Sequence, residues 1–341
     1  MQWNEQIIID PAPSACVLGA CATSFVACAR WMRTAFVALC FAVVAPGIAG
    51  LAMGGERYFA TRVALVTGAN KGIGFEIAKG LAKARFTVVL GCRDTGLGDA
   101  AARDLRTNYG LEVAVARLDL TEPASWAACV ASIEASFGRL DLLVNNAAVC
   151  FNDPTLFGRV AHTPFVRQAR LTIETNFFGT LGLTRACLPL LRLSAKDAAS
   201  PRIVNLASAA GRLSIVKSPE LRAAVSDANL EISALEDLMR SFVAAVEAGT
   251  HEAAGWPNTC YGVSKVGIIA MTRALARAEP DVMVNAVDPG FCKTDQNAHR
   301  GRDPASLGAA TTIHLAGIPF CEPVSGKFFA QDKREVDWLA T

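Results

Sequence analysis

The sequence contains no tract of lysine or arginine, and its formal net charge is only +2 over 341 residues. Nucleic-acid-binding proteins carry basic clusters that neutralise phosphates, so the sequence gives no support to that class of function. The 11 cysteines include no Cys-x-x-Cys pair and no cluster with histidine, so we expect no metal site. Cys16, Cys21, Cys28 and Cys40 fall in the first 60 residues, and the others are dispersed. Such a set indicates reduced thiols in a cytoplasmic or cytosol-like compartment rather than a disulfide framework.

Aromatic residues are also scarce, at 7% of a chain that is 52% hydrophobic. A core of this composition is built from Ala, Val and Leu, as in α/β proteins. After the first 60 residues there is no internal repeat and no low-complexity linker. Residues 61–341 are therefore expected to form one domain, a size that a single large α/β fold accommodates.

Residues 1–60 form a leader of a different kind. Residues 34–53 carry no charge and follow Arg30 and Arg33, and this length just spans a bilayer. The region upstream of this run is too long for a signal peptide, and Glu5 and Asp10 fit a transit peptide poorly. Three interpretations stay open: a membrane anchor acting through residues 34–53, an organelle leader, or an extension absent from a working protein that starts at Met53.

Beyond the leader, short apolar runs alternate with amphipathic helical segments. Runs rich in β-branched residues that alternate with helices predict a parallel sheet covered on both faces, the doubly wound Rossmann-type α/β arrangement. The predicted strands are Val63–Val66, Thr87–Leu90, Val113–Leu118, Leu140–Val144, Arg202–Leu206 and Val282–Val287. The first helix is expected from about Ile73 to Ala84.

A glycine-rich turn joins the first predicted strand to the first helix, in the sequence Thr67-Gly-Ala-Asn-Lys-Gly-Ile-Gly74. Gly68 permits a tight turn, Gly72 lets backbone amides approach a pyrophosphate, and Gly74 lets helix pack on strand. The helix N-terminus then supplies partial positive charge to phosphates. This context predicts a dinucleotide site that includes Asn70, Lys71 and Ile73.

The choice of cofactor is read at the end of the second strand, where an NAD site places an acidic residue on the ribose 2′-hydroxyl. Here Cys92 occupies that position and Arg93 follows it, while Asp94 comes one position late. Lys71 is expected to face the same corner as Arg93. Two cations suit a 2′-phosphate, so we expect NADP(H).

Tyr261 and Lys265 lie four residues apart in a predicted helix, which places a phenol and an ammonium on one helical face. A lysine charge at that distance is expected to lower the pKa of the tyrosine towards neutrality. Such a tyrosine can give a proton to a carbonyl oxygen or take one from an alcohol.

With these two motifs in place, the chain from Thr61 onward resembles the short-chain dehydrogenase/reductase family. Four further segments match the family in order: Leu118-Asp-Leu120, Asn145-Asn-Ala-Ala148, Thr175-Asn-Phe-Phe-Gly179 and Val204-Asn-Leu-Ala-Ser208, followed by Pro289-Gly290 with Thr294-Asp295. Ala148 departs from the family's glycine. The resemblance implies a catalytic set of Asn176, Ser208, Tyr261 and Lys265. It also implies cofactor contacts from Asp119, Leu120, Asn145, Ala147, Tyr261, Lys265, Pro289, Gly290 and Thr294.

An insertion before the tyrosine narrows the resemblance, because Ser208 and Tyr261 are 53 positions apart and most members have far fewer residues there. Residues 209–257 are expected to be helical. Ser218-Pro219 predicts a helix start, and Ser233 with Glu236 predicts a capping box. An apolar stripe follows, ending near Gly249: Leu235, Leu238, Met239, Phe242, Val243 and Val246. The insertion resembles that of the monomeric carbonyl reductases and their plant relatives, where it covers the surface that others use to form oligomers, so a monomer is implied.

The resemblance implies NADPH-dependent reduction of a ketone, aldehyde or quinone. Tyr261 would act as the general acid, Lys265 would lower the pKa of Tyr261 and bind ribose hydroxyls, Ser208 would hold the carbonyl oxygen, and Asn176 would position a water. Phe291, and a long segment from Cys150 to Arg170, indicate an apolar or aromatic carbonyl substrate. Two alternatives stay open: an alcohol dehydrogenase acting on a terpenoid, steroid or retinoid, and a dinucleotide-binding regulator without turnover.

Overall fold

The structure, a computed structural model, describes residues 62–151, 163–195, 201–318 and 324–341. These residues form an eight-stranded sheet in the order β3-β2-β1-β4-β5-β6-β7-β8. The strands are β1 (Val63–Thr67), β2 (Thr87–Cys92), β3 (Ala114–Arg117), β4 (Leu142–Asn145), β5 (Arg202–Leu206), β6 (Met283–Val287), β7 (Phe328–Phe329) and β8 (Glu335–Val336). The six predicted strands are confirmed, with β5 at its predicted bounds and the ends of the others shifted by at most two residues.

Pairing is parallel from β3 through to β7, as the buried apolar runs predicted. The last pair departs from the prediction of a parallel sheet, because β8 runs antiparallel to β7. Only two residues long, both strands form a short hairpin at the edge of the sheet. A short edge of this kind offers little backbone for pairing with another chain.

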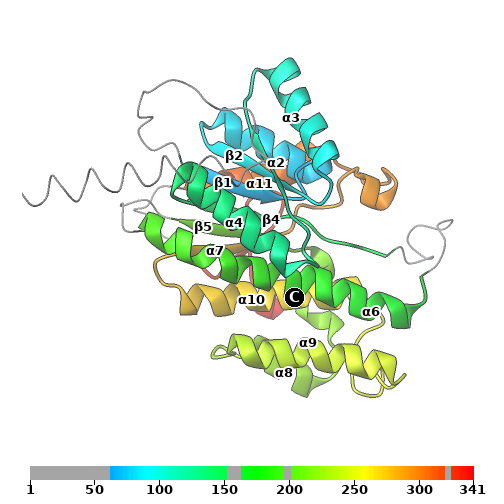
Figure 1. The fold of residues 1–341 in the computed structure, drawn as a ribbon. Coiled ribbons are helices and arrows are strands. Elements are labelled where there is room, and N and C mark those ends of the chain that lie inside the picture. Colours follow the sequence, from blue (N-terminus) through cyan, green and yellow to red (C-terminus); the bar gives the residue numbers. More distant parts are fainter. Residues whose placement is uncertain (1–61, 152–162, 196–200, 319–323) are drawn as a thin grey trace, which may run out of the picture. The chain divides into compact units, whose positions relative to one another are not determined.

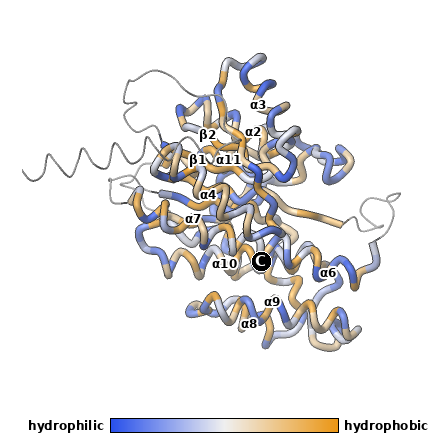
Figure 2. Tube along the Cα trace, viewed as in Figure 1, coloured by the Kyte–Doolittle hydropathy of each residue, from blue (hydrophilic) through white to orange (hydrophobic). Residues whose placement is uncertain are grey.

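Helices cover both faces of the sheet (Figure 1). One face packs against α2 (Gly72–Lys83), α3 (Thr95–Tyr109) and α11 (Ala305–Gly317) in one apolar cluster. The other packs against α4 (Pro123–Phe137), α7 (Thr180–Ala195) and α10 (Cys260–Ala278) in a second, larger cluster. The doubly wound arrangement is therefore confirmed, and strands β1 and β2 are almost wholly buried between the two layers of helices, as their hydrophobic colour in Figure 2 reflects.

The parallel register brings the carboxyl ends of the strands to one edge. Thr67 pairs with Gly91 near the end of β2, and Leu206 pairs with Val287. Ligands of open α/β sheets bind at this edge, and most of the predicted site segments leave a strand or begin a helix there, whereas Asn176 lies in the helical stretch that leads into α7.

The insertion before Tyr261 forms two helices, α8 (Pro219–Ser226) and α9 (Ile232–Glu247). Ser218 caps α8 as predicted, accepting from Leu221 N at 3.1 Å. The predicted capping box at Ser233 is wrong, because the N-cap of α9 is Glu231, two residues earlier, and Leu235 N donates to Glu231 O at 3.0 Å.

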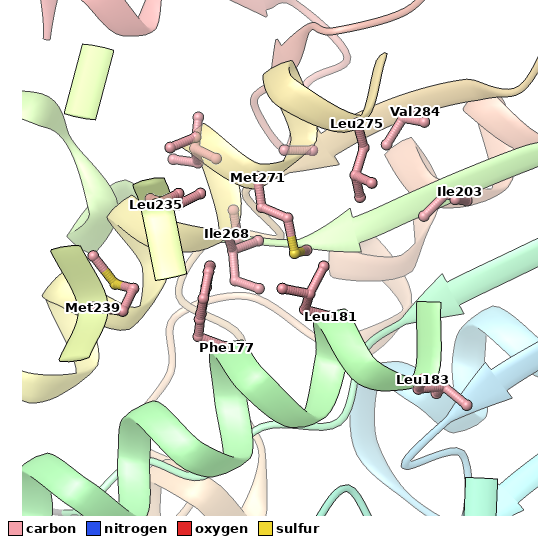
Figure 3. Close-up of a cluster of buried hydrophobic side chains, with 14 of the residues drawn as sticks. Phe177, Leu181, Leu183, Ile203, Leu235, Met239, Ile268, Met271, Leu275 and Val284 are labelled. Carbon is pink, nitrogen blue, oxygen red and sulfur yellow. The ribbon is translucent and has the colours of Figure 1, made fainter. Parts of the chain in front are cut away.

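The apolar stripe of α9 is confirmed, and it packs on α10 and on α6 (Phe165–Ile173). Figure 3 shows Leu235 and Met239 of α9 beside Phe177 and Ile268. The fit is close at Gly267 of α10, where an added Cβ would lie 2.8 Å from Met239 Sδ and 3.0 Å from Phe177.

In the described part of the chain, no helix is both long and apolar enough to span a bilayer. The leader of residues 1–60, including the candidate anchor at 34–53, lies outside the described residues.

Candidate active site

The glycine-rich turn has the geometry that dinucleotide binding requires. Gly68 and Gly72 adopt φ of 63° and 58°, values that side chains rarely adopt. A Cβ on Gly74 would collide with the carbonyl oxygen of Gly68, so only glycine fits there. The N-cap of α2, Lys71, makes no side-chain hydrogen bond to the first turn. The first amides of α2, which include those of Ile73 and Gly74, can therefore bind an anion.

The Asn-Asn-Ala-Ala segment after β4 holds the glycine-rich turn in place through Asn146 and Thr67, neither of which was predicted as a site residue. Asn146 Nδ2 donates to Thr67 O at 2.8 Å and to Gly68 O at 3.2 Å. The hydroxyl oxygen of Thr67 accepts from the backbone N of Asn146 and of Ala147, each at 2.9 Å.

The side chain of Asn145, a predicted cofactor contact, is buried and forms hydrogen bonds in the interior. Its Nδ2 donates to Asn205 Oδ1 at 2.8 Å and to Thr184 Oγ1 at 3.1 Å. The side chain thus joins β4, β5 and α7 beneath the site.

The end of β2 carries the residues expected to select the cofactor. Cys92 is buried, and burial raises the pKa of its thiol to about 11. Arg93 is exposed. Asp94 is used as the N-cap of α3, where its Oδ1 accepts from Leu97 N at 3.1 Å. The Asp94 carboxylate, one position after Arg93, therefore has a structural role.

Asp119 lies next to this corner, after β3. Burial acts to raise its pKa, but hydrogen bonds from Thr121 and the nearby charges of Arg93 and Arg117 hold the pKa below its usual value. Leu120 is buried, and its backbone and Cβ lie so close to Gly179 that no larger residue fits there.

Lys71, expected to face the same corner as Arg93, forms an ion pair with a carboxylate of the loop after β6. Lys71 Nζ lies 2.7 Å from Asp295 Oδ2, and Asp295 also faces His299 at 3.0 Å. The Thr294 methyl lies within 3.5 Å of where a Gly72 Cβ would stand. The loop after β6 is thus bound to the glycine-rich turn by an ion pair.

Tyr261 and Lys265 lie one turn apart at the start of α10, as their spacing predicted. Thr259 caps this helix by accepting from Gly262 N at 3.0 Å. The Lys265 side chain is 4% exposed, its Nζ donates to Leu206 O at 2.6 Å, and it lies 5.4 Å from the centre of the Tyr261 ring.

Asn176 and Ser208 complete the predicted catalytic set, and backbone groups of other residues form hydrogen bonds with both side chains. Asn176 lies in a π-helical segment, Glu174–Gly179, where one extra residue per turn often marks a functional position. Its Oδ1 accepts from Val149 N at 2.8 Å, and its Nδ2 donates to Ser264 Oγ at 3.1 Å beside Lys265. Ser208 Oγ accepts from Ala210 N at 3.1 Å, which leaves its proton free to donate.

The pKa of Tyr261 moves opposite to the expected direction. Burial raises it above its ordinary value, and the nearby Cys150 and Asp288 add to the rise. Hydrogen bonds with Ser208 and Gln296 act the other way without reversing the shift. Burial also lowers the pKa of Lys265, to about 8. At neutral pH the tyrosine therefore holds its proton.

Two neighbours of Tyr261 were not found from the sequence: Asp288 and Gln296. They come from the loop after β6, which also contains Pro289, Gly290 (φ 76°) and Thr294. One signal was available for Asp288, because it directly follows a buried strand at the edge where the site forms.

A separate cavity of about 500 Å³ lies at the β7–β8 edge, lined by residues such as Arg273, Lys327 and Trp338. None of the predicted site residues lines it. Lys327 is paired there with Glu335 at 2.8 Å. We therefore place the chemistry at the carboxyl edge of the sheet.

The fold and this edge define a dinucleotide-binding α/β enzyme with a Tyr–Lys pair beside a glycine-rich turn. The family profile described as short chain dehydrogenase matches residues 62–222. Carbonyl reductase (NADPH) 1 of Sus scrofa is 36% identical over 289 residues, which cover 82% of this chain and 94% of that protein. (+)-Neomenthol dehydrogenase of Capsicum annuum is 35% identical, covering 80% and 97% of the two chains.

Among solved structures, salutaridine reductase from Papaver somniferum superimposes with a TM-score of 0.71 at 31% identity, covering 78% of this chain and 99% of that one. The chain belongs to the short-chain dehydrogenase/reductase family. It is an oxidoreductase acting on carbonyl or hydroxyl groups.

Proposed function

We propose that the protein reduces a ketone, aldehyde or quinone with NADPH, with Tyr261 as general acid. The observation that carries this proposal is the Tyr261 phenol, which carries the proton to be donated, one turn from the buried Lys265, whose Nζ lies 5.4 Å from the centre of the Tyr261 ring. Reduction consumes that proton, whereas oxidation of an alcohol requires the phenolate. The relatives named as NADPH carbonyl reductases support the same cofactor and direction.

The residues present fit a dinucleotide. The uncapped first turn of α2 and the three glycines of the turn would hold the pyrophosphate, with Arg93 and the flanking Asp119, Leu120 and Ala147 around the nucleoside. When bound, NADPH supplies the hydride, and the protein supplies orientation and electrostatics.

In the proposed reaction, the Ser208 hydroxyl donates a hydrogen bond to the substrate's carbonyl oxygen, and Tyr261 donates its proton as negative charge develops there. The Lys265 ammonium, fixed on Leu206 O, stabilises the phenolate that is left. Asn176, fixed on Val149 and Ser264, holds the π-helical segment against α10 beside Lys265.

The substrate is proposed to be apolar or aromatic, because Phe291 is 50% exposed on the loop that approaches the site. Residues 152–162 of the long segment before α6 lie outside the described residues.

Consumption of NADPH tests the proposal, with a panel of quinones, aromatic aldehydes and terpenoid ketones. We expect reduction of at least one class. No turnover with any of them would favour the non-catalytic regulator.

A second candidate, an alcohol dehydrogenase acting on a terpenoid, is favoured by the similarity to neomenthol dehydrogenase. The ratio of oxidation to reduction at pH 7 separates the two. The protonated Tyr261 predicts that reduction is faster, and that oxidation rises with pH as the phenolate forms.

A further inference from the structure

Lys265 carries a charge that the protein interior must compensate. Lys265 is 4% exposed, and within the described part of the chain its ammonium donates a hydrogen bond to the neutral carbonyl oxygen of Leu206. Among the ion pairs of the described residues, none includes Lys265. A buried ammonium without a compensating charge is costly and tends to lose its proton.

The pairing of β5 with β6 places one carboxylate, that of Asp288, on the face of the sheet that α10 covers. Leu206, which binds the Lys265 amine, pairs with Val287, the last residue of β6. Both side chains belong to the apolar cluster around α2 and α11, whereas Ala286 and Ala207 belong to the cluster that contains α10. Because side chains alternate along a strand, the next residue, Asp288, points to the α10 side.

The ladder continues through this residue, so the alternation holds there. Asp288 N donates to Phe329 O at 2.8 Å, as a strand residue does, and Ala207 N donates to Val287 O at 2.8 Å. Asp288 Oδ1 accepts from Gly290 N at 3.1 Å, which orients the carboxylate.

Few other ionisable groups face this position. Cys150, from the segment after β4, faces both Tyr261 and Lys265. Cys292 faces Asp288 and Asp303, and burial raises the pKa of its thiol, so it is neutral at pH 7. Asp288 is the carboxylate among the charged neighbours of both Tyr261 and Lys265.

We propose that the Asp288 carboxylate is the counter-ion of the Lys265 ammonium and acts as a positioning residue for the proton donor. Asp288 itself touches neither the substrate nor the transferred proton. It favours the charged form of Lys265 against the effect of burial, and the charged lysine is the form that stabilises the Tyr261 phenolate. The inference rests on the proposed function and adds a residue to it.

The test is the pH profile of kcat/KM for carbonyl reduction by the wild-type chain and by Asp288→Asn. The wild-type rate is expected to fall above about pH 8, as Lys265 loses its proton. Removing the carboxylate lowers the pKa of Lys265, so the alkaline limb should move down by about one pH unit. Asp288→Glu, which keeps the charge, should restore the wild-type limb.

A matched control comes from the other end of the same strand. Asp281 is exposed just before β6, and Asp281→Asn should leave the profile unchanged. An alkaline limb in Asp288→Asn that coincides with the wild-type limb would overturn the proposal, as would an equal shift in Asp281→Asn. Should Asp288→Asn fail to fold, Asp288→Ser carries the same expectation, since its hydroxyl can still accept from Gly290 N.

A second readout does not depend on turnover. Lysine-selective NMR, with the Lys265 signal assigned through Lys265→Arg, should show Lys265 titrating at lower pH in Asp288→Asn than in the wild type. If the wild-type chain reduces no carbonyl compound, the proposed function fails while this titration still decides the role of Asp288. If the enzyme is active but Lys265 titrates in Asp288→Asn as it does in the wild type, the proposed role of Asp288 fails and the proposed function stands.

Discussion

At the scale of single residues, burial dominates the chemistry of the site. The one-turn spacing of Tyr261 and Lys265 brings their side chains together, but removal from water raises the pKa of the phenol and lowers that of the amine. Both shifts favour the uncharged form, as desolvation does. The result is a protonated donor at neutral pH, which suits a reductase.

The first prediction concerns that donor. Tyr261→Phe removes the proton but keeps the ring, so carbonyl reduction should fall by at least ~10² while NADPH binding persists. Stopped-flow turnover together with fluorescence titration of NADPH measures both. Tyr109→Phe, at an exposed tyrosine of α3, serves as the control and should be silent. Turnover retained by Tyr261→Phe would remove the assigned role.

The second prediction concerns the choice of cofactor. Arg93 is exposed directly after β2, and the structure uses Asp94 as a helix cap. Arg93→Glu should therefore weaken NADPH by about tenfold or more and change NADH little, because only NADPH carries the 2′-phosphate.

Arg85, an exposed residue just before β2, provides the comparison. Arg85→Glu makes the same change of charge at the opposite edge of the sheet and should leave both affinities as they are. Isothermal titration with each nucleotide measures them. An unchanged preference in Arg93→Glu would mean that the NADP(H) assignment is wrong.

At the scale of elements, the sequence patterns correctly predicted the strands and turns that depend on residues close together in the chain. The β-branched runs gave the strands from Val63 to Val287, and the glycine spacing gave the turn at Gly68, because each depends on neighbours in sequence. The start of α9 was mispredicted at Ser233 because the backbone ladder of Glu231 and Leu235 begins earlier than the side-chain pattern suggests.

The contacts between distant elements were beyond reach from the sequence. Asn146 binds Thr67 across 79 positions, and Lys71 pairs with Asp295 across 224. Asp288 comes near Tyr261 and Lys265 of α10 through the pairing of β5 with β6. Residue type marked these side chains as polar, but only the assembled sheet edge shows which groups they face.

The third prediction belongs to α9. Met239 is fully buried against Gly267 and Phe177, so Met239→Ala leaves a cavity and should lower the free energy of unfolding by about 2–5 kcal/mol. Ser241→Ala, on the exposed side of the same helix, should change it by less than about 0.5 kcal/mol. Urea unfolding followed by circular dichroism measures both. Equal small effects would mean that α9 does not pack on α10 as described.

At the scale of the whole molecule, the insertion has a consequence for assembly. Helices α8 and α9 pack on α10, and α9 also packs on α6. Arg170 of α6 forms an ion pair with Glu247 of α9 at 2.8 Å. The parts of α6 and α10 that contact α9 are thus covered by the chain itself.

The fourth prediction follows from this covered surface: the protein is a monomer. Its sedimentation coefficient and its light-scattering mass should correspond to one chain of 36.0 kDa and should not change with concentration in the micromolar range. A charged residue at the packed face, as in Phe242→Glu, should unfold α9 or expose the surface beneath it, because Phe242 is buried against Trp256. That variant should therefore self-associate or precipitate, whereas Ser241→Glu, on the exposed side, should stay monomeric. A stable dimer of the wild-type chain would show that the insertion leaves an oligomer interface open.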